Sequence, residues 1–365
     1  MAGNGGWWLV AIGQPQLCAA GVDSGWVSVT SAADPSKPCC PFSTFKDFRT
    51  VTLQFRAPLA TPGTRGLAVT LTLTLTLTFT LIASCATAPE AMGPLRAETV
   101  VAVTDAARLI RFNAGQPQRI LHSKPLQGLA PGNRLIGIDY RVARGVLYAV
   151  SASGHVYTLD ADSAQLTRVG SGAPVVFSGQ HFGVDFNPVA DRIRVVSDSG
   201  QNLRLHPDSG ALAAADPALR LSAGSALAAG AMPPGIAGAM VPRIAGAMVP
   251  RIAGAAYTYN KHNDKLSTNF AIDLTSGTLL VQGSREGVVP EVSPNSGELG
   301  AVGALGTGAL DDAAFDIADL NNAALAALRS GGRTRLHAVD LASGRATLIG
   351  TVGDGSRLWG MAIVP

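Results

Sequence analysis

The stretch GQHFGVDFNPVADRIRVVSDSGQNLRLHPDSGAL (179–212) contains the clearest pattern of short strands and turns in this sequence. It contains three short segments in which apolar and polar residues alternate, namely GVDF (183–186), RIRVVS (192–197) and NLRL (202–205). Alternation with period two is typical of a β-strand that has one buried face. The segments are separated by residues that favour turns, ending with the pentad HPDSG (206–210). The stretch therefore predicts consecutive antiparallel hairpins.

The turn pentad is repeated along the chain, each time between two short apolar-alternating runs. In most copies its first residue can bond its own backbone, and its last is Gly or Ala where positive φ is needed. The five copies are NAGQP (113–117), DADSA (160–164), HPDSG (206–210), DLTSG (273–277) and DLASG (340–344). This repetition predicts an architecture built from similar all-β units.

A second repeat precedes the hairpins, with the copies GIDY (137–140), GVDF (183–186) and the looser AFDI (314–317). Combined with the turn pentads, it gives four short strands in a unit of roughly 46 residues, which is typical of a β-propeller blade. Five pentads predict five blades. Six blades are the alternative, because SPNSG (293–297) resembles one more degenerate turn.

The two ends of the repeat region complement each other. TVVAVT (99–104) begins where the second strand of a blade is expected, and LWGMAIVP (358–365) matches a first strand that has no successor. We therefore expect these strands to pair and to close the ring, which removes its open sheet edges.

One irregularity is a tandem duplication. IAGAMVPR (236–243) occurs again at 244–251, and the sequence then continues as IAGAAYTY (252–259). Only one copy fits the blade pattern. We expect the insert 236–251 to form a loop before a strand at 252–259.

The N-terminal quarter has a different character. Residues 66–84 are uncharged and follow Arg65, and LTLTLTLTFTLIASC (71–85) ends at a cysteine. Ile82-Ala83-Ser84-Cys85 resembles the lipobox of bacterial lipoprotein signal peptides, which implies cleavage before Cys85 and lipidation of its thiol. An ordinary signal, an uncleaved anchor and a β-strand are the alternatives for this segment.

The predicted domain organisation follows from these segments. Residues 1–65 lack the repeat and are either a disordered extension or an overrun of the true start site, while 66–84 are the signal segment. Residues 85–97 are a tether and 98–365 form the propeller. The chain is thus predicted to be exported and membrane-anchored, facing the periplasm or the cell surface, with secretion as the alternative.

Composition excludes several classes of protein. The net charge is only +3 and no dense run of Lys and Arg occurs, so a nucleic-acid partner is not expected. All four cysteines lie at or before Cys85, so the propeller region has neither a disulfide framework nor a thiolate metal site. We expect a monomer that contacts the membrane only through its lipid anchor.

No catalytic or cofactor motif is recognisable, and the histidines are dispersed. We therefore predict no catalytic residues, no metal and no cofactor. The carboxylates that recur once per repeat are expected to accept backbone N–H groups, or alternatively to converge on the channel and bind a cation or a polar ligand: Asp139, Asp185 and Asp316. The densest polar set within one blade is the candidate ligand site: His181, Asp185, Asn187, Asp198, Gln201 and Asn202.

With these repeats assembled, the region from about Glu98 to Pro365 resembles the DUF4394 family of bacterial domains. The residues that carry the resemblance are 179–212, RLIGIDYRVARGVLYAVSASGHVYTLD (134–160) and LIGTVGDGSRLWGMAIVP (348–365). The resemblance implies a propeller-like fold in an exported protein and supplies no reaction. The duplicated insert and the long N-terminal stretch depart from the family.

Two functions are compatible with these features. The first is a binding or scaffolding module whose partner is an unknown protein or a small polar ligand. The alternative is an enzyme of hydrolase or lyase type with its site in the central channel. Carboxylates, His or Arg clustered at the channel mouth would favour the enzyme, whereas walls of glycine, alanine and backbone would favour the binding module.

Overall fold

The structure of the protein is a computed structural model. It describes residues 91–222 and 250–365 together with the short segments 22–23, 26–27, 243–244 and 247–248. The chain divides into two compact units, residues 1–86 and 87–365. In the first unit, β1 (Val22–Asp23) and β2 (Trp26–Val27) form an antiparallel pair. The hydrophobic segment 66–84 and Cys85 lie outside the described residues.

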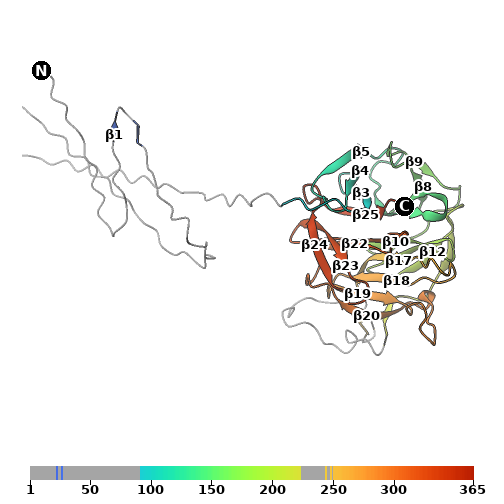
Figure 1. Cartoon of the computed structure of the whole chain (residues 1–365). Helices are drawn as coiled ribbons and strands as arrows, with labels where there is room; N and C mark the ends of the chain where they lie inside the picture. The colour runs from blue at the N-terminus through green and yellow to red at the C-terminus, as the bar shows by residue number, and fades with distance from the viewer. Residues whose placement is uncertain (1–21, 24–25, 28–90, 223–242, 245–246, 249) are drawn as a thin grey trace, which may run out of the picture. The chain divides into compact units, whose positions relative to one another are not determined.

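The second unit contains five antiparallel sheets that surround a common centre (Figure 1). The innermost strand of each sheet packs against the innermost strands of both neighbouring sheets. In ring order these strands are β25 (Leu358–Ile363), β6 (Leu135–Arg141), β10 (Phe182–Asn187), β17 (Ile252–Tyr257) and β21 (Asp312–Ile317). The protein is therefore a five-bladed β-propeller, as the sequence predicted, and the six-blade alternative is wrong.

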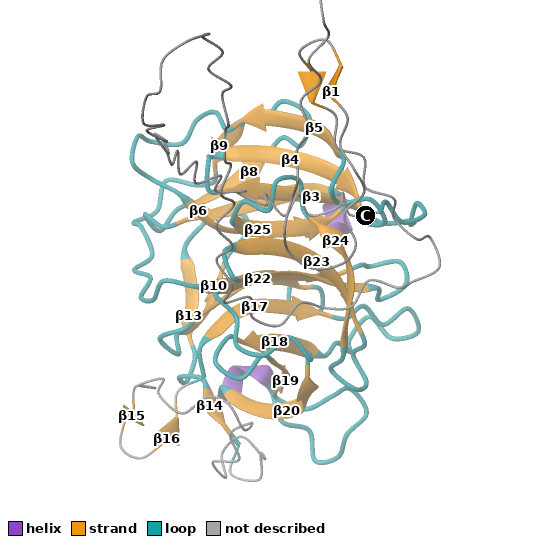
Figure 2. Ribbon diagram, turned by 90° about the vertical axis from the view of Figure 1, so that its left-hand side faces the viewer, coloured by secondary structure: helices purple, strands orange, loops and turns teal. Residues whose placement is uncertain are grey.

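Each blade continues outward from its inner strand through three more strands (Figure 2). The second strands are β3 (Thr99–Thr104), β7 (Val146–Ser151), β11 (Arg192–Ser197), β18 (Asn269–Asp273) and β22 (Ala324–Ser330). The third strands are β4 (Arg108–Asn113), β8 (Val156–Leu159), β12 (Asn202–Leu205), β19 (Thr278–Gln282) and β23 (Arg333–Val339). The outer strands are β5 (Ile120–Pro125), β9 (Leu166–Arg168), β13 (Leu212–Ala215), β20 (Glu298–Ala304) and β24 (Ala346–Thr351).

Few other elements occur in the described part of the chain. The helical ones are the short 3-10 turns η1 (Val142–Arg144) and η2 (Pro294–Ser296), and no helix there is long and apolar enough to cross a membrane. The short strand β14 (Arg220–Leu221) adds to β20 in parallel. Within the duplicated insert, β15 (Arg243–Ile244) pairs with β16 (Ala247–Met248), and most of the insert's other residues lie outside the described ones.

The ring is closed by the two ends of the propeller chain. The C-terminal strand β25 pairs antiparallel with β3, for example through Met361 opposite Ala102 and Ile363 opposite Val100. The composite blade is therefore held together by backbone hydrogen bonds between segments more than 250 residues apart in sequence. Closure by the N- and C-terminal strands was predicted from the sequence and is confirmed.

The fourth blade, which begins with β17, differs from the other four in its turns. DLTSG (273–277) joins its second and third strands, whereas in the other blades the pentad joins the third and fourth. SPNSG (293–297), the motif behind the six-blade alternative, contains η2 and leads directly into β20. The pentads thus mark hairpins correctly, but they do not all mark the same hairpin.

The inner strands approach one another so closely that a side chain at their repeated glycine would clash with the neighbouring strand. A Cβ atom added to Gly183 would lie 2.6 Å from the backbone nitrogen of Ala255 on β17, and one added to Gly137 would lie 2.4 Å from the Val184 Cβ. In the same way, a Cβ atom on Gly360 would lie 2.8 Å from the nitrogen of Ile138. The first residue of the G-x-D motif is therefore fixed by ring packing.

We predict that Gly183→Ala lowers the free energy of unfolding by about 1–3 kcal/mol, because the added methyl group must displace the backbone of β17. Urea denaturation of the full chain measures this loss. The matched control is Gly172→Ala, where the nearest atom to the new methyl group is 3.8 Å away and no loss is expected. Equal stability of the two variants would contradict the packing argument.

Candidate functional site

The six residues of the predicted ligand site do not lie together in the structure. Four of them make hydrogen bonds that stabilise loops and strands of the propeller. Asn187 Oδ1 accepts two backbone amide hydrogens in the turn between β10 and β11. Asp198 Oδ1 accepts the amide hydrogens of the two residues before β10. The Gln201 amide bridges the backbone of residues 176–178. Asn202 is buried and accepts from the guanidinium of Arg194. These four side chains are occupied by structural hydrogen bonds.

The remaining two, His181 and Asp185, lie at different levels of the central channel. His181 precedes β10 and lies at one mouth, where it contacts Asp312. Asp185 lies four residues further along, inside the ring of inner strands. The candidate set therefore does not form one site, and each of its two channel residues belongs to a separate cluster.

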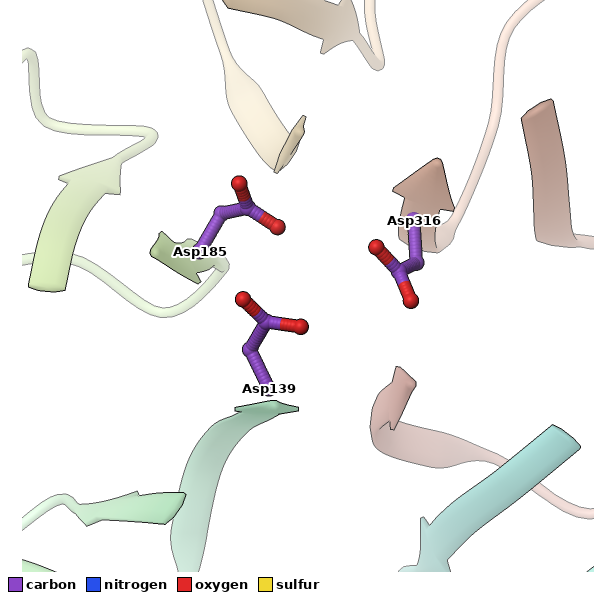
Figure 3. A group of neighbouring side chains, drawn as sticks. All are labelled: Asp139, Asp185 and Asp316. Atoms are coloured by element: carbon purple, nitrogen blue, oxygen red, sulfur yellow. The ribbon is translucent and has the colours of Figure 1, made fainter. Parts of the chain in front are cut away.

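The first cluster consists of the three carboxylates that recur in the sequence. Asp139 on β6, Asp185 on β10 and Asp316 on β21 point toward a common centre (Figure 3) and offer carboxylate oxygens that all lie within 4.8 Å of one another. All three side chains are buried. The equivalent positions in the other two inner strands are Ala256 on β17 and Ala362 on β25. The ring is thus lined by three acids and two alanines.

Each aspartate accepts a backbone amide hydrogen from the next inner strand around the ring. Asp139 Oδ2 lies 2.7 Å from the nitrogen of Phe186, and Asp185 Oδ2 lies 2.9 Å from the nitrogen of Tyr257. The third acid, on β21, bonds in the same way to β25. These bonds link neighbouring blades at the axis, where a backbone N–H without an acceptor is costly.

Two strands, β6 and β21, follow a blade that has alanine in place of the acid, and each is capped by its own aspartate. Asp316 accepts the amide hydrogen of Ile317 with Oδ1, at 2.6 Å, as well as that of Ile363 with Oδ2, at 2.5 Å. Asp139 likewise accepts from Tyr140 in addition to its neighbour. Three carboxyl groups therefore satisfy five equivalent amides, one from each blade. The sequence predicted that these acids accept backbone N–H groups, and in the structure they do so at the amides of the inner strands.

Burial in the ring makes these carboxyl groups hold protons. Desolvation raises the pKa of Asp139 to about 7, although its amide hydrogen bonds act in the opposite direction. Desolvation, followed by repulsion from neighbouring carboxylates, raises the pKa values of Asp185 and Asp316 well above the usual range. The carboxyl groups of Asp139 and Asp185 also lie close enough for each to influence the pKa of the other. The triad therefore keeps protons at neutral pH.

Three carboxylates at this spacing are also a donor set that suits a hard divalent cation. Each of them, however, already accepts at least one backbone amide hydrogen. The amide hydrogens of the inner strands already bond to oxygens of this group, so a structural role accounts for the geometry. We assign the triad to ring closure.

The second cluster lies at the mouth where the inner strands begin. The Nδ1 atom of His181 is 2.9 Å from Oδ1 of Asp312, which is the first residue of β21. Nε of Arg357, just before β25, donates to the other carboxylate oxygen of Asp312 at 2.5 Å. These three side chains come from three blades that are distant in sequence. They meet only because the ring brings the starts of the inner strands together.

Two arginine side chains of this cluster lie over the ring of one aromatic side chain. The guanidinium carbons of Arg134 and Arg357 lie 4.2 Å and 3.9 Å from the ring centroid of Trp359, within the range of cation–π attraction. Arg134 also lies 5.9 Å from the ring of Phe182. The mouth cluster therefore contains two arginines, one histidine, one acid and one indole: Arg134, Arg357, His181, Asp312 and Trp359.

A narrow cavity connects this cluster to the interior of the ring. Trp359 and Phe182 line it together with small residues of all five inner strands: Gly137, Gly183, Gly254, Ala314 and Gly360. It is about the size of one water molecule. A ligand larger than water must therefore bind at the mouth and not deep within the ring.

Sequence reasoning missed most of the mouth cluster, although a signal for two of its arginines is present. RLIG (134–137) and RLWG (357–360) are the same R-L-x-G motif at the start of two inner strands, and each places Arg three residues before the channel glycine. Superposing the repeats at that glycine would have placed both arginines at one mouth. Asp312 had no comparable signal, because its blade replaces the motif with Asp-Asp-Ala-Ala.

We predict that Asp185→Asn folds and weakens the pH dependence of stability. Asn Oδ1 can accept from Tyr257 while Nδ2 donates to Asp139, as protonated Asp185 does. In the wild type the raised pKa of Asp185 means that the folded state binds more protons, so this contribution is full below the unfolded pKa of about 4 and is lost as pH rises from there through the raised folded pKa. Chemical denaturation should therefore show that the free energy of unfolding of the variant, relative to that of the wild type, increases between about pH 5 and about pH 8.

The matched control is Asp139→Asn, which offers one acceptor oxygen to two amides, those of Phe186 and Tyr140. One buried N–H is left unpaired, and we expect this variant to be about 1–3 kcal/mol less stable than Asp185→Asn. A stability difference between wild type and Asp185→Asn that does not change with pH would show that the triad is not a protonated structural cap.

Comparison with known proteins places these features in a family. The comparison with curated proteins found no match. Among solved structures, the chain is similar to the dihydro-heme d1 dehydrogenase NirN (11% identity, TM-score 0.30), of which it spans 46% while 73% of this chain is covered. It is also similar to the nidogen/laminin complex (10%, TM-score 0.38, 73% of this chain and 98% of that one).

A third similar structure is a structural genomics protein of unknown function from Bacteroides thetaiotaomicron (12% identity, TM-score 0.39, 68% of this chain and 56% of that one). The family model described as "Domain of unknown function (DUF4394)" matches residues 108–362, which include all three aspartates of the triad, all but the last residue of β25 and the whole mouth cluster. The chain belongs to the DUF4394 family.

Proposed function

We propose that this chain is an exported, lipid-anchored binding module that holds a small polar ligand at one mouth of its propeller channel. The observation that carries the binding role is the pair of guanidinium groups, from Arg134 and Arg357, stacked on Trp359 where the channel opens. Cationic and aromatic groups that converge at a concave opening are typical of ligand sites. The rigid ring holds them in place without a ligand.

Export and anchoring rest on the sequence before the propeller. The uncharged segment 66–84 and the lipobox-like Ile82–Cys85 support cleavage and lipidation, and the tether 85–97 would separate the propeller from the membrane. We expect mass spectrometry of the protein from its native host to find an acylated Cys85 as the first residue. A mature protein that retains residues 1–84 would contradict the anchor.

An enzyme is the second candidate, and the contact between His181 and Asp312 is the observation that favours it. A carboxylate that orients an imidazole is half of a general-base arrangement. Among the described residues, however, no hydroxyl or thiol hydrogen-bonds to the His181 ring, which contacts Asp312 and Arg357. The pair lacks the nucleophile of an acyl-transfer site, so we rank binding first.

Fluorine NMR of the full chain labelled with fluorotryptophan tests the binding role, because Trp359 lies in the cluster and the other three tryptophans lie at or before residue 26. Trp359→Phe assigns the signal. We expect some member of a set of small anionic, neutral and cationic compounds to shift the Trp359 signal saturably and to raise the melting temperature. The compound should be recovered unchanged.

Conversion of the bound compound would favour the enzyme. The binding role would be contradicted if the compounds that stabilise the protein leave the Trp359 signal unchanged, or if no compound affects either measurement.

A further inference from the structure

The two arginines of the mouth cluster differ in how their charges are balanced. Arg357 donates to the carboxylate of Asp312 at 2.5 Å. Arg134 forms no ion pair with any described residue, and its side-chain hydrogen bonds run to two backbone carbonyls at 3.4 Å and 3.5 Å, near the limit for such bonds. The N–H donors of the Arg134 guanidinium are therefore only weakly hydrogen-bonded within the protein.

The mouth cluster as a whole also has an excess of positive charge. Two guanidinium groups face one carboxylate, so Arg134, Asp312 and Arg357 together carry a net charge of +1. Partial burial, followed by repulsion from Arg357, lowers the pKa of Arg134, while attraction to Asp312 acts in the opposite direction. An anion bound at Arg134 would neutralise the cluster and satisfy the guanidinium donors.

We propose that the mouth cluster binds the carboxylate group of a small planar organic acid, with Arg134 as the direct ligand. This inference rests on the proposed binding function and specifies its ligand class. A guanidinium fork matches the two oxygens of a carboxylate, and a single negative charge matches the net +1 of the cluster. A dianionic phosphate would leave excess negative charge beside Asp312.

The surroundings of Arg134 also select the body of the ligand. Trp359 and Phe182 line the opening with aromatic surface, and the wall behind them is made of glycine and alanine. Because the guanidinium groups of Arg134 and Arg357 already lie over the Trp359 ring, a flat apolar ring attached to the carboxylate would gain its buried area against Phe182. The cavity itself is too narrow for such a ring, so the ligand stays at the mouth.

The test uses three probes of nearly the same shape with the full chain: benzoate, its neutral isostere benzamide, and phenyl phosphate. The fluorine signal of Trp359 is followed in each titration. We expect a saturable shift with benzoate, and at least tenfold weaker binding of benzamide and phenyl phosphate. Arg134→Gln should weaken benzoate binding by about tenfold or more, since a charge-assisted pair is lost.

Arg134→Lys distinguishes planar recognition from charge alone, and we expect it to recover only part of the affinity. Arg168→Gln is the matched control, because Arg168 on the outer strand β9 lies outside the cluster and bonds a carbonyl of its own loop. It should bind benzoate like the wild type. Thermal melts of all variants confirm that they are folded.

The outcomes separate this inference from the proposed function. Equal binding of benzoate and benzamide, tighter binding of phenyl phosphate, or unchanged benzoate binding by folded Arg134→Gln would overturn the carboxylate proposal. The binding role would still hold in each of these cases, because the probe acts at Trp359. Absence of any shift with benzoate overturns the carboxylate proposal, and the broader compound set then decides whether the binding role falls with it.

Discussion

The structure depends on how five inner strands satisfy their backbone at a crowded axis. An inner strand pairs with its own blade on one side only, so the amides on its other side must find acceptors within the ring. Three buried carboxyl groups provide these acceptors for one amide of each blade. Because the acceptors sit between blades, they contribute to ring closure as well as to the individual sheets.

The same axis explains the repeated G-x-D motif as a unit. The glycine is required where neighbouring inner strands touch, and the aspartate two residues later reaches the amide of the next strand. Blades that carry alanine at the acidic position can do so because the following blade caps its own amide. The irregular distribution of the acids, three in five blades, is therefore compatible with complete satisfaction of the five equivalent amides.

Much of the fold could be predicted from the sequence because its information is local. A turn pentad and an alternating run lie within a few residues of each other, and their repetition indicates blades. The number of blades was harder to derive, since DLTSG (273–277) marks a different hairpin from the other pentads. The turn chemistry reports that a hairpin exists, but it does not report which strands of the blade the hairpin joins.

The site was less predictable for a physical reason. Asn187, Asp198, Gln201 and Asn202 form a dense polar set in sequence, yet each is used by the backbone or by a neighbouring scaffold residue. The mouth cluster is instead assembled from different blades, so no single stretch of sequence contains it. Only superposition of the repeats at the channel glycine brings Arg134 and Arg357 to the same level.

At the axis, we expect protons and not a cation to neutralise the three acids. Neutron diffraction from crystals grown at neutral pH in deuterated solvent, with calcium and magnesium supplied, tests it most directly. The account predicts deuterium between Asp139 and Asp185 and amide deuterium directed at all three carboxyl groups. A metal ion coordinated by Asp139, Asp185 and Asp316, with the carboxylates fully ionised, would contradict it.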